Sequence, residues 1–139
     1  RLTRVELLLL LAADYASVDA SGKLNILGAF RTIYAQQFPA RHALMHLIVK
    51  LRPALGELGD TRTLRIVLVY EDGNQHLEMS SDFLIQPVAE GVQPEFNAVV
   101  GIRDLVFPQA GRYEFRLFVD KEQKGDIAID VVQGPQSVN

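Results

Sequence analysis

The chain is a succession of apolar runs in which hydrophobic and polar positions often alternate. Within residues 42–52, one set of alternate positions is wholly apolar: Met45, Leu47, Val49 and Leu51. Because successive side chains of a strand point to opposite faces, this spacing predicts a strand with one face on the core. The same period returns late in the chain, where the expected inner face is Tyr113, Phe115, Leu117 and Val119.

The segment 13–30 predicts a β-hairpin. Its two apolar arms flank residues 19–22, where small polar side chains and a glycine are typical of a tight turn. We expect a first strand over about residues 5–17 and a second over about residues 23–34. Pro39 closes the second segment, because proline lacks the N–H that a central strand would use.

Further strands are expected along the rest of the chain, at residues 64–70, 75–85, 96–103 and 126–132. Asp72 and Gly73 form a pair that favours a two-residue hairpin. Residues 53–61 hold one proline and two glycines, so we expect a loop there with at most a single helical turn. About eight strands, with turns about every 8 to 12 residues, predict an all-β fold: a single antiparallel β-sandwich, immunoglobulin-like or similar, with little helix.

Length and composition fit one domain. With 139 residues, 48% of them hydrophobic, the chain can bury a core of its own. We place this domain at residues 1–133 and expect a polar C-terminal tail at residues 134–139.

The charge pattern argues against nucleic acid as a partner. The 14 basic and 17 acidic residues are interspersed and give a net charge of -3, so no single-signed field is expected. The chain has no cysteine, which excludes disulfides and thiolate chemistry and suits a reducing compartment. The cytoplasm is therefore the default localisation.

The leucine run at residues 7–11 resembles the core of a signal peptide or a membrane span. The apolar stretch 5–13 is interrupted by Glu6 and is much shorter than the roughly 20 residues that a span needs. We therefore expect a buried strand and no membrane span. The sequence starts at Arg1 rather than Met, which leaves open that upstream residues, a leader among them, are missing.

Two stretches carry a resemblance to a family. The first is A-D-Y-A-x-V-x-A-x-G-K-L-N-I-L-G-A-F at residues 13–30, followed by Phe38 and Pro39. The second is F-P-x-x-G-x-Y-x-F-x-L-x-V-D at residues 107–120. Together they resemble an uncharacterised bacterial family, a domain of unknown function, over nearly the whole chain. The resemblance implies a small β-sandwich and supplies no catalytic residue, because its motifs consist of turn and core residues.

His42 and His46 have the spacing of a metal-binding helix, on which two histidines four residues apart share one face. Here they lie on an expected strand, where four residues span about 13 Å. The glutamate of an H-E-x-x-H motif is also missing. We therefore expect surface histidines rather than a zinc site.

Acidic residues near turns raise the question of calcium, which prefers oxygen ligands. The candidates are Asp60, Asp72 with Asn74, Asp104, and Asp120 with Glu122. None has the dense D-x-D-x-D spacing of a dedicated loop, and turn geometry accounts for them better. No serine lies in a G-x-S-x-G setting, and the glycines at 56 and 59 precede no Lys-Ser/Thr pair. We predict no catalytic residue, no metal ligand and no cofactor.

What remains is an excess of apolar surface. We expect an interaction surface at Leu7, Leu9, Leu11 and Phe118, because the first strand is almost unbroken in its apolar character and Phe118 occupies an outward position. Our hypothesis is a non-catalytic structural or protein-interaction module, paired through an edge strand with copies of itself or with another bacterial protein. The alternatives are a small-ligand or metal-binding domain with a calcium-type loop site, or a minor hydrolase. If the first strand is instead central and fully covered, the alternative is a monomer that binds a ligand between its loops.

Overall fold

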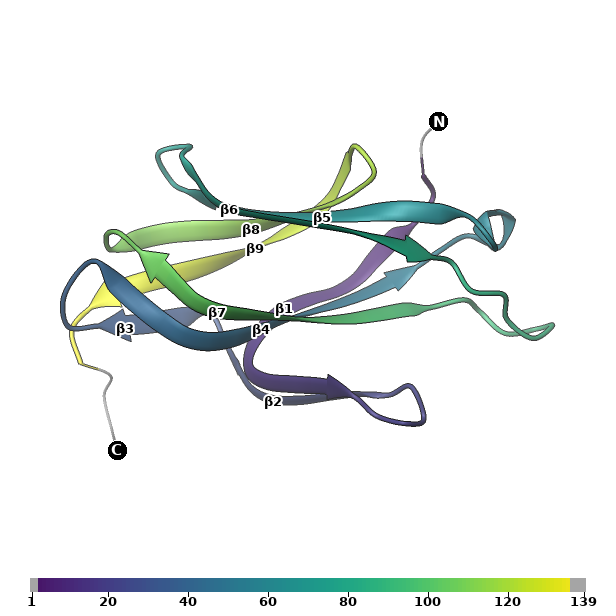
Figure 1. Ribbon diagram of the computed structural model, residues 1–139, viewed down its shortest axis with the longest axis horizontal. Helices are drawn as coiled ribbons and strands as arrows, with labels where there is room; N and C mark the ends of the chain where they lie inside the picture. Colours follow the sequence, from purple (N-terminus) through teal and green to yellow (C-terminus); the bar gives the residue numbers. More distant parts are fainter. Residues whose placement is uncertain (1–2, 136–139) are drawn as a thin grey trace.

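Nine strands form two stacked sheets over residues 3–135, the part of the chain that the computed structural model describes (Figure 1). In chain order the elements are β1 (Glu6–Val18), β2 (Leu24–Phe30), β3 (Thr32–Ala35), β4 (Ala40–Arg52), η1 (Leu55–Glu57), β5 (Thr61–Tyr70), β6 (Gln75–Leu84), β7 (Phe96–Phe107), β8 (Gly111–Val119) and β9 (Glu122–Gln133). One sheet has the order β2-β1-β4-β7 and the other the order β3-β9-β8-β5-β6. The predicted all-β sandwich is confirmed.

The main core lies between the sheets, where the two alternating patterns meet. Met45, Leu47, Val49 and Leu51 on β4 are fully buried, and so are Tyr113, Phe115, Leu117 and Val119 on β8. The Tyr113 hydroxyl donates to the carbonyl of Gln109 at 2.7 Å, which satisfies the polar end of an otherwise apolar side chain. The late sequence motif is therefore a turn held by its own buried tyrosine.

The expected second strand, residues 23–34, is wrong as a single element. The chain leaves the first sheet after Phe30 and enters the second sheet at Thr32, where β3 pairs with β9. This pairing is parallel, with Thr32 opposite Asp130, whereas the other strand pairs of the sandwich are antiparallel. Two polar residues, Arg31 and Thr32, stand at this change, but they do not identify it from the sequence, because the residues on both sides favour extended backbone.

The β1–β2 hairpin folds over the outer face of the β4–β7 pair and adds a local third layer (Figure 1). Its contacts define a small outer cluster, made of Ala13, Ala16 and Ile48 with Leu9, Leu11, Leu24 and Val99 packed around them. Ile48 belongs to the outward-facing set of β4 and is nevertheless fully buried. Hydrophobic residues on both faces of the first strand are thus accounted for by two separate cores.

The turn of this hairpin is held by Asp19. Its carboxylate accepts hydrogen bonds from the backbone N–H groups of Ser21 and Lys23, at 2.9 and 3.0 Å. Gly22 follows with a φ of +85°, a conformation that costs glycine nothing. The predicted hairpin is confirmed, including the position of its turn.

Two expectations concern the ends of the chain. Residues 136–139 of the expected tail and residues 1–2 of the expected domain lie outside the described residues. Within residues 3–135, the helical segment η1 is three residues long, so no described helix has the length and apolar character needed to cross a membrane.

Candidate functional site

The exposed edge of β2 is the first candidate surface. β2 ends its sheet, and its five central residues, 25–29, are all exposed. Leu27 is 69% exposed, and its partner across the ladder, Tyr15, is 52% exposed. An edge strand of this kind presents unpaired N–H and C=O groups beside apolar side chains, which is the arrangement that another strand can use.

The hairpin turn determines which backbone groups of β2 face outward. Asp19 and Lys23 close the turn, with the N–H of Asp19 donating to the Lys23 carbonyl at 2.9 Å. Because hydrogen-bonded and non-bonded pairs alternate along an antiparallel ladder, the next pair, Val18 with Leu24, is a non-bonded one, and the backbone groups of Leu24 point away from β1. The same alternation places the N–H and C=O of Ile26 on the open edge.

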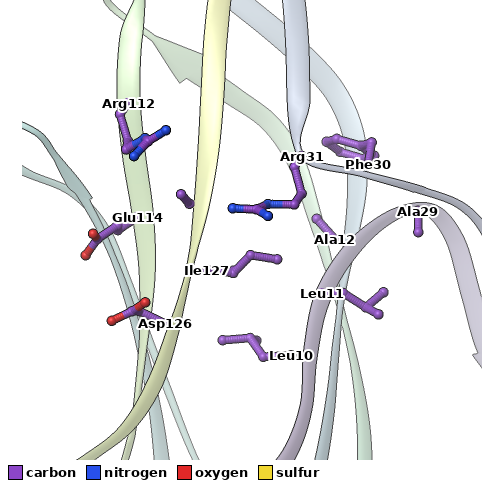
Figure 2. A pocket seen from close by; sticks show the side chains of 11 residues that line it. Leu10, Leu11, Ala12, Ala29, Phe30, Arg31, Arg112, Glu114, Asp126 and Ile127 are labelled. Carbon is purple, nitrogen blue, oxygen red and sulfur yellow. The ribbon is translucent and has the colours of Figure 1, made fainter.

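A lateral groove between the sheets is the second candidate surface. It has a volume of about 890 Å³ and lies where β9 of one sheet faces β1 of the other (Figure 2). Leu10 and Ile127 point toward one another across this gap, and both are only partly buried. The groove is therefore lined in part by apolar side chains at the lateral edge of the main core.

Charged side chains surround this groove. Arg112 donates two hydrogen bonds to Asp130, at 2.9 and 3.4 Å. The pKa of Asp130 is lowered, chiefly by these bonds and also by the positive charge of Arg31. Figure 2 shows the Arg31 guanidinium extending into the gap toward β9. Within residues 3–135 it forms no ion pair with a carboxylate.

The four residues of the expected interaction surface lie in three different environments. Leu7 packs on the main core, while Leu9 and Leu11 pack on the small outer cluster. Phe118 lies on the outer face of the opposite sheet, where the Arg65 guanidinium covers its ring at 4.1 Å. The structure therefore does not gather these four side chains into one patch. β1 lies between β2 and β4, so the first strand is central and offers no free edge for pairing.

The two histidines lie on β4 next to the hairpin. A ring nitrogen of His46 lies 3.2 Å from the Asp14 carbonyl oxygen, and the ring meets Tyr15 edge-on. Burial lowers the pKa of His42, while the charge of Asp14 acts in the opposite direction. No group of three His, Cys, Asp or Glu side chains suited to a metal ion occurs in the described part of the chain.

The carboxylates considered for calcium are engaged by other groups. Asp60 and Asp120 each accept a hydrogen bond from Arg62 at 3.2 Å, and Asp72 accepts one from the N–H of Asn74 at 2.9 Å. The remaining two pair with cations: Asp104 with Arg41 and Glu122 with Lys124. Asp104 and Asp120 also adopt a φ of +53°, which short polar side chains tolerate.

Sequence reasoning missed a buried carboxylate, Glu57, which lies in η1. It accepts hydrogen bonds from the hydroxyl of Thr3 and the guanidinium of Arg62, at 2.8 and 2.9 Å. A third bond comes from the N–H of Ala54. One glutamate in a loop rich in glycine gives no signal of burial, because its partners come from distant parts of the chain. Through these hydrogen bonds Glu57 connects Thr3 of the N-terminal segment with Arg62 of β5, which is a structural role.

Comparison with solved structures finds two similar chains, and the first of them supports the fold. The chain is similar to the alkylpurine DNA glycosylase AlkC of Pseudomonas fluorescens, in a structure bound to DNA containing an abasic site analogue, with a TM-score of 0.56 and 10% identity. That match covers 94% of this chain and 31% of the glycosylase, so the chain spans under a third of that protein. An immunoglobulin-like protein from Pseudomonas aeruginosa matches with a TM-score of 0.42 and 14% identity, over 92% of this chain and 96% of the other.

A search of curated proteins finds no match to the sequence. The sequence pattern of DUF6941, a family of unknown function, matches residues 8–132. This match confirms the expectation of an uncharacterised domain family, which rested on the hairpin and on the late Phe-Pro motif. The chain therefore belongs to DUF6941, a family of unknown function.

Proposed function

We propose that this domain is a non-catalytic interaction module that associates through the open edge of β2, with a second copy of itself as the partner. The observation that carries the proposal is the combination on β2 of unpaired backbone groups and exposed apolar side chains, above all Leu27. Single exposed apolar residues are common on protein surfaces. Here they lie on a free strand edge, where backbone pairing can fix the register of a partner.

Pairing of two copies through β2 gives a closed dimer. If the two β2 strands run antiparallel about a two-fold axis, each copy presents the same edge and the same side chains. The two sheets then become one continuous sheet, and the outward N–H and C=O of Leu24 and Ile26 acquire partners. The Leu27 side chains of both copies lie close to this axis, because residue 27 is at the middle of β2.

The alternative functions have less support. A calcium-type loop site would need carboxylates that are free to bind an ion, whereas those of Asp60, Asp72 and Asp120 are held by an arginine or by a turn. A hydrolase would need a nucleophile beside a base. In the described chain, neither His42 nor His46 has a serine or threonine hydroxyl among its hydrogen-bond partners.

Light scattering after size-exclusion chromatography, over a range of concentrations, tests self-association. The wild type is expected to shift from monomer to dimer as concentration rises. Ile26→Pro removes an outward N–H while leaving the bonds between β1 and β2, so this variant is expected to remain monomeric with an unchanged fold. Ile26→Thr keeps the N–H and serves as the matched control.

Two outcomes contradict the proposal. One is a monomeric mass for the wild type at every concentration, which removes self-association. The other is a dimer that Ile26→Pro does not weaken, which places the contact away from β2. Leu9 is not a suitable position for this test, because it packs in the small outer cluster and a charge there would perturb folding.

A further inference from the structure

The edge of β9 that faces the lateral groove is only partly covered by the rest of the chain. β3 pairs with residues 130–133 of β9, the last part of the strand. At the other end, Lys124 donates to the carbonyl of Thr3, and the Leu7 side chain lies directly against Gly125. Residues 126–129 between these two contacts have no strand beside them on this edge in the described structure. They span about 13 Å, the length of a four-residue strand.

The backbone groups on this open edge can be assigned from the neighbouring bond. The N–H of Asp130 points toward β3, because it donates to the carbonyl of Arg31 at 2.8 Å. Residues two apart along a strand direct their backbone groups to the same side. The N–H and C=O of Asp126 and Ala128 therefore face the groove, while those of Ile127 face β8.

The side chains of the groove are suited to an extended, mainly apolar segment. Leu10 and Ile127 form its apolar walls and are partly buried at the mouth of the main core. An apolar side chain that entered between them would be removed from water on both sides, which is favourable.

One end of the open edge carries an available positive charge. Arg31 immediately precedes β3, so it lies at the end where residues 126–129 give way to the β3–β9 pair. Its guanidinium extends into the groove (Figure 2). Arg112, the other cation that lines the groove, already donates to both oxygens of Asp130. Arg31 is therefore the group that would meet a carboxylate arriving at this end.

We propose that the lateral groove binds the C-terminal end of a partner protein, which adds to β9 as a short parallel strand and places its terminal carboxylate on Arg31. The charge determines the direction. A strand parallel to β9, in line with β3, ends at Arg31 and brings a negative charge to it. An antiparallel strand would direct its N-terminal end toward this cation. Backbone pairing with an added strand and capture of a terminal carboxylate are both known modes of peptide recognition.

Fluorescence anisotropy with short peptides tests this site. The probes are fluorescein-labelled pentapeptide pools that are random except for a fixed last residue, either Val, Leu, Phe, Asp or Lys. Each pool is made both as the free acid and as the C-terminal amide. Free-acid pools that end in an apolar residue are expected to bind, and the matched amides to bind about ten- to one-hundredfold more weakly, the loss expected for a hydrogen bond to a charged group.

Three variants locate the binding. Arg31→Gln is expected to weaken the free-acid pools as much as amidation does, whereas Arg31→Lys keeps part of the affinity. Ala128→Pro removes one outward N–H and spares the β8 ladder, so it is expected to lower affinity with the thermal midpoint retained. Ala128→Ser is its control. Ile26→Pro is expected to leave peptide affinity unchanged, so peptide binding at the groove and self-association through β2 are tested independently.

The possible results each decide the question. Binding of acid and amide pools with equal affinity overturns carboxylate capture, and the absence of binding by every pool overturns the site altogether. If free-acid pools bind to Ala128→Pro as well as to the wild type, strand addition to β9 is wrong. Slower hydrogen exchange at the amides of Asp126 and Ala128 in the presence of a bound pool is the positive result expected for strand addition.

Discussion

The Glu57 carboxylate and the Arg62 guanidinium form an ion pair of 2.9 Å that is almost wholly withdrawn from water, with the two side chains 1% and 11% exposed. Asp60 and Asp120 also contact Arg62, and Thr3 contacts Glu57, so the pair connects the N-terminal segment with two loops. A charge buried in this way is stable only while its partners are present.

Replacement of this carboxylate is therefore expected to destabilise the fold. Glu57→Gln keeps the shape of the side chain but leaves Arg62 with two partly exposed carboxylates, so the free energy of unfolding should fall by about 2 kcal/mol. Urea denaturation measures this. Glu6→Gln, at an exposed pair with Arg52, is the control and should change stability by under about 0.5 kcal/mol. Equal effects of the two changes would show that burial of the Glu57 pair adds nothing.

The contribution of Glu57 should also depend on pH. Burial alone would raise its pKa, but hydrogen bonds from Thr3, Ala54 and Arg62 together outweigh burial and lower it. A carboxyl whose pKa is lower in the folded state stabilises the fold above its unfolded pKa and loses this effect as pH falls through the folded value. The stability difference between wild type and Glu57→Gln should therefore be constant near neutral pH and shrink in acid. A difference that grew on acidification would contradict the ion pair.

A second prediction concerns the small outer cluster. Ile48→Ala should lower the free energy of unfolding by about 2 to 4 kcal/mol, because Ile48 is fully buried between the hairpin and the sheet. Val106→Ala, at a position that is 46% exposed, should cost less than about 0.5 kcal/mol. Chemical denaturation compares the two. If Ile48→Ala lowered the free energy of unfolding no more than the control does, the hairpin would not cover Ile48 in solution.

Gly28 lies where the hairpin bends, with a φ of +72°. A Cβ atom added there would lie 2.5 Å from a carboxylate oxygen of Asp14. Gly28→Ala should therefore cost more than Gly22→Ala, which has a similar φ but open space around it. The left-handed backbone alone costs about 1 to 2 kcal/mol in each variant.

A double-mutant cycle isolates the contact between Gly28 and Asp14. If crowding against Asp14 causes the extra cost of Gly28→Ala, the addition of Asp14→Ala should remove it. An extra cost that persists in the double variant would assign the strain to the backbone alone.

The turn carboxylate of Asp19 provides a prediction by NMR. Its pKa is lowered to about 2, first by the Ser21 hydroxyl and then by the N–H of Lys23 and the amide of Asn25. Carboxyl-detected titration should find this value in the wild type and a higher one in Ser21→Ala. Because the folded pKa is depressed, the stabilising effect of the turn is present at neutral pH and is lost as pH falls toward about 2. An unchanged pKa in Ser21→Ala would show that the hydroxyl is not the main cause.

The regular parts of the fold could be predicted from the sequence, because inward positions recur with period two. The alternation at Met45 and Leu47 and that at Phe115 and Leu117 specified the inner faces of β4 and β8, and burial confirms both. Turns that a side chain stabilises by local hydrogen bonds, such as the one at Asp19, could also be predicted. These features depend on residues that are close together in the sequence.

The features that define the candidate surfaces depend on distant residues and could not be predicted. Nothing near Arg31 indicates that the chain changes sheets there, because the partner of β3 is supplied by the last strand. The sequence around Leu9 does not show whether this side chain is buried or exposed. It is partly buried because the hairpin folds over Ile48 and forms the small outer cluster. The burial of Glu57 is likewise set by Thr3 and Arg62, which are remote from its own loop.

The parallel pair of β3 with β9 has a consequence for biosynthesis. Thr32 is made about 100 residues before Asp130, so during translation β3 remains without its partner until β9 has left the ribosome. The β1–β2 hairpin, whose two arms are adjacent in sequence, can form long before that. β2 and β3, which lie on either side of Arg31, thus acquire their partners at different stages of synthesis. During that interval β3 is an unpaired strand that a chaperone can bind.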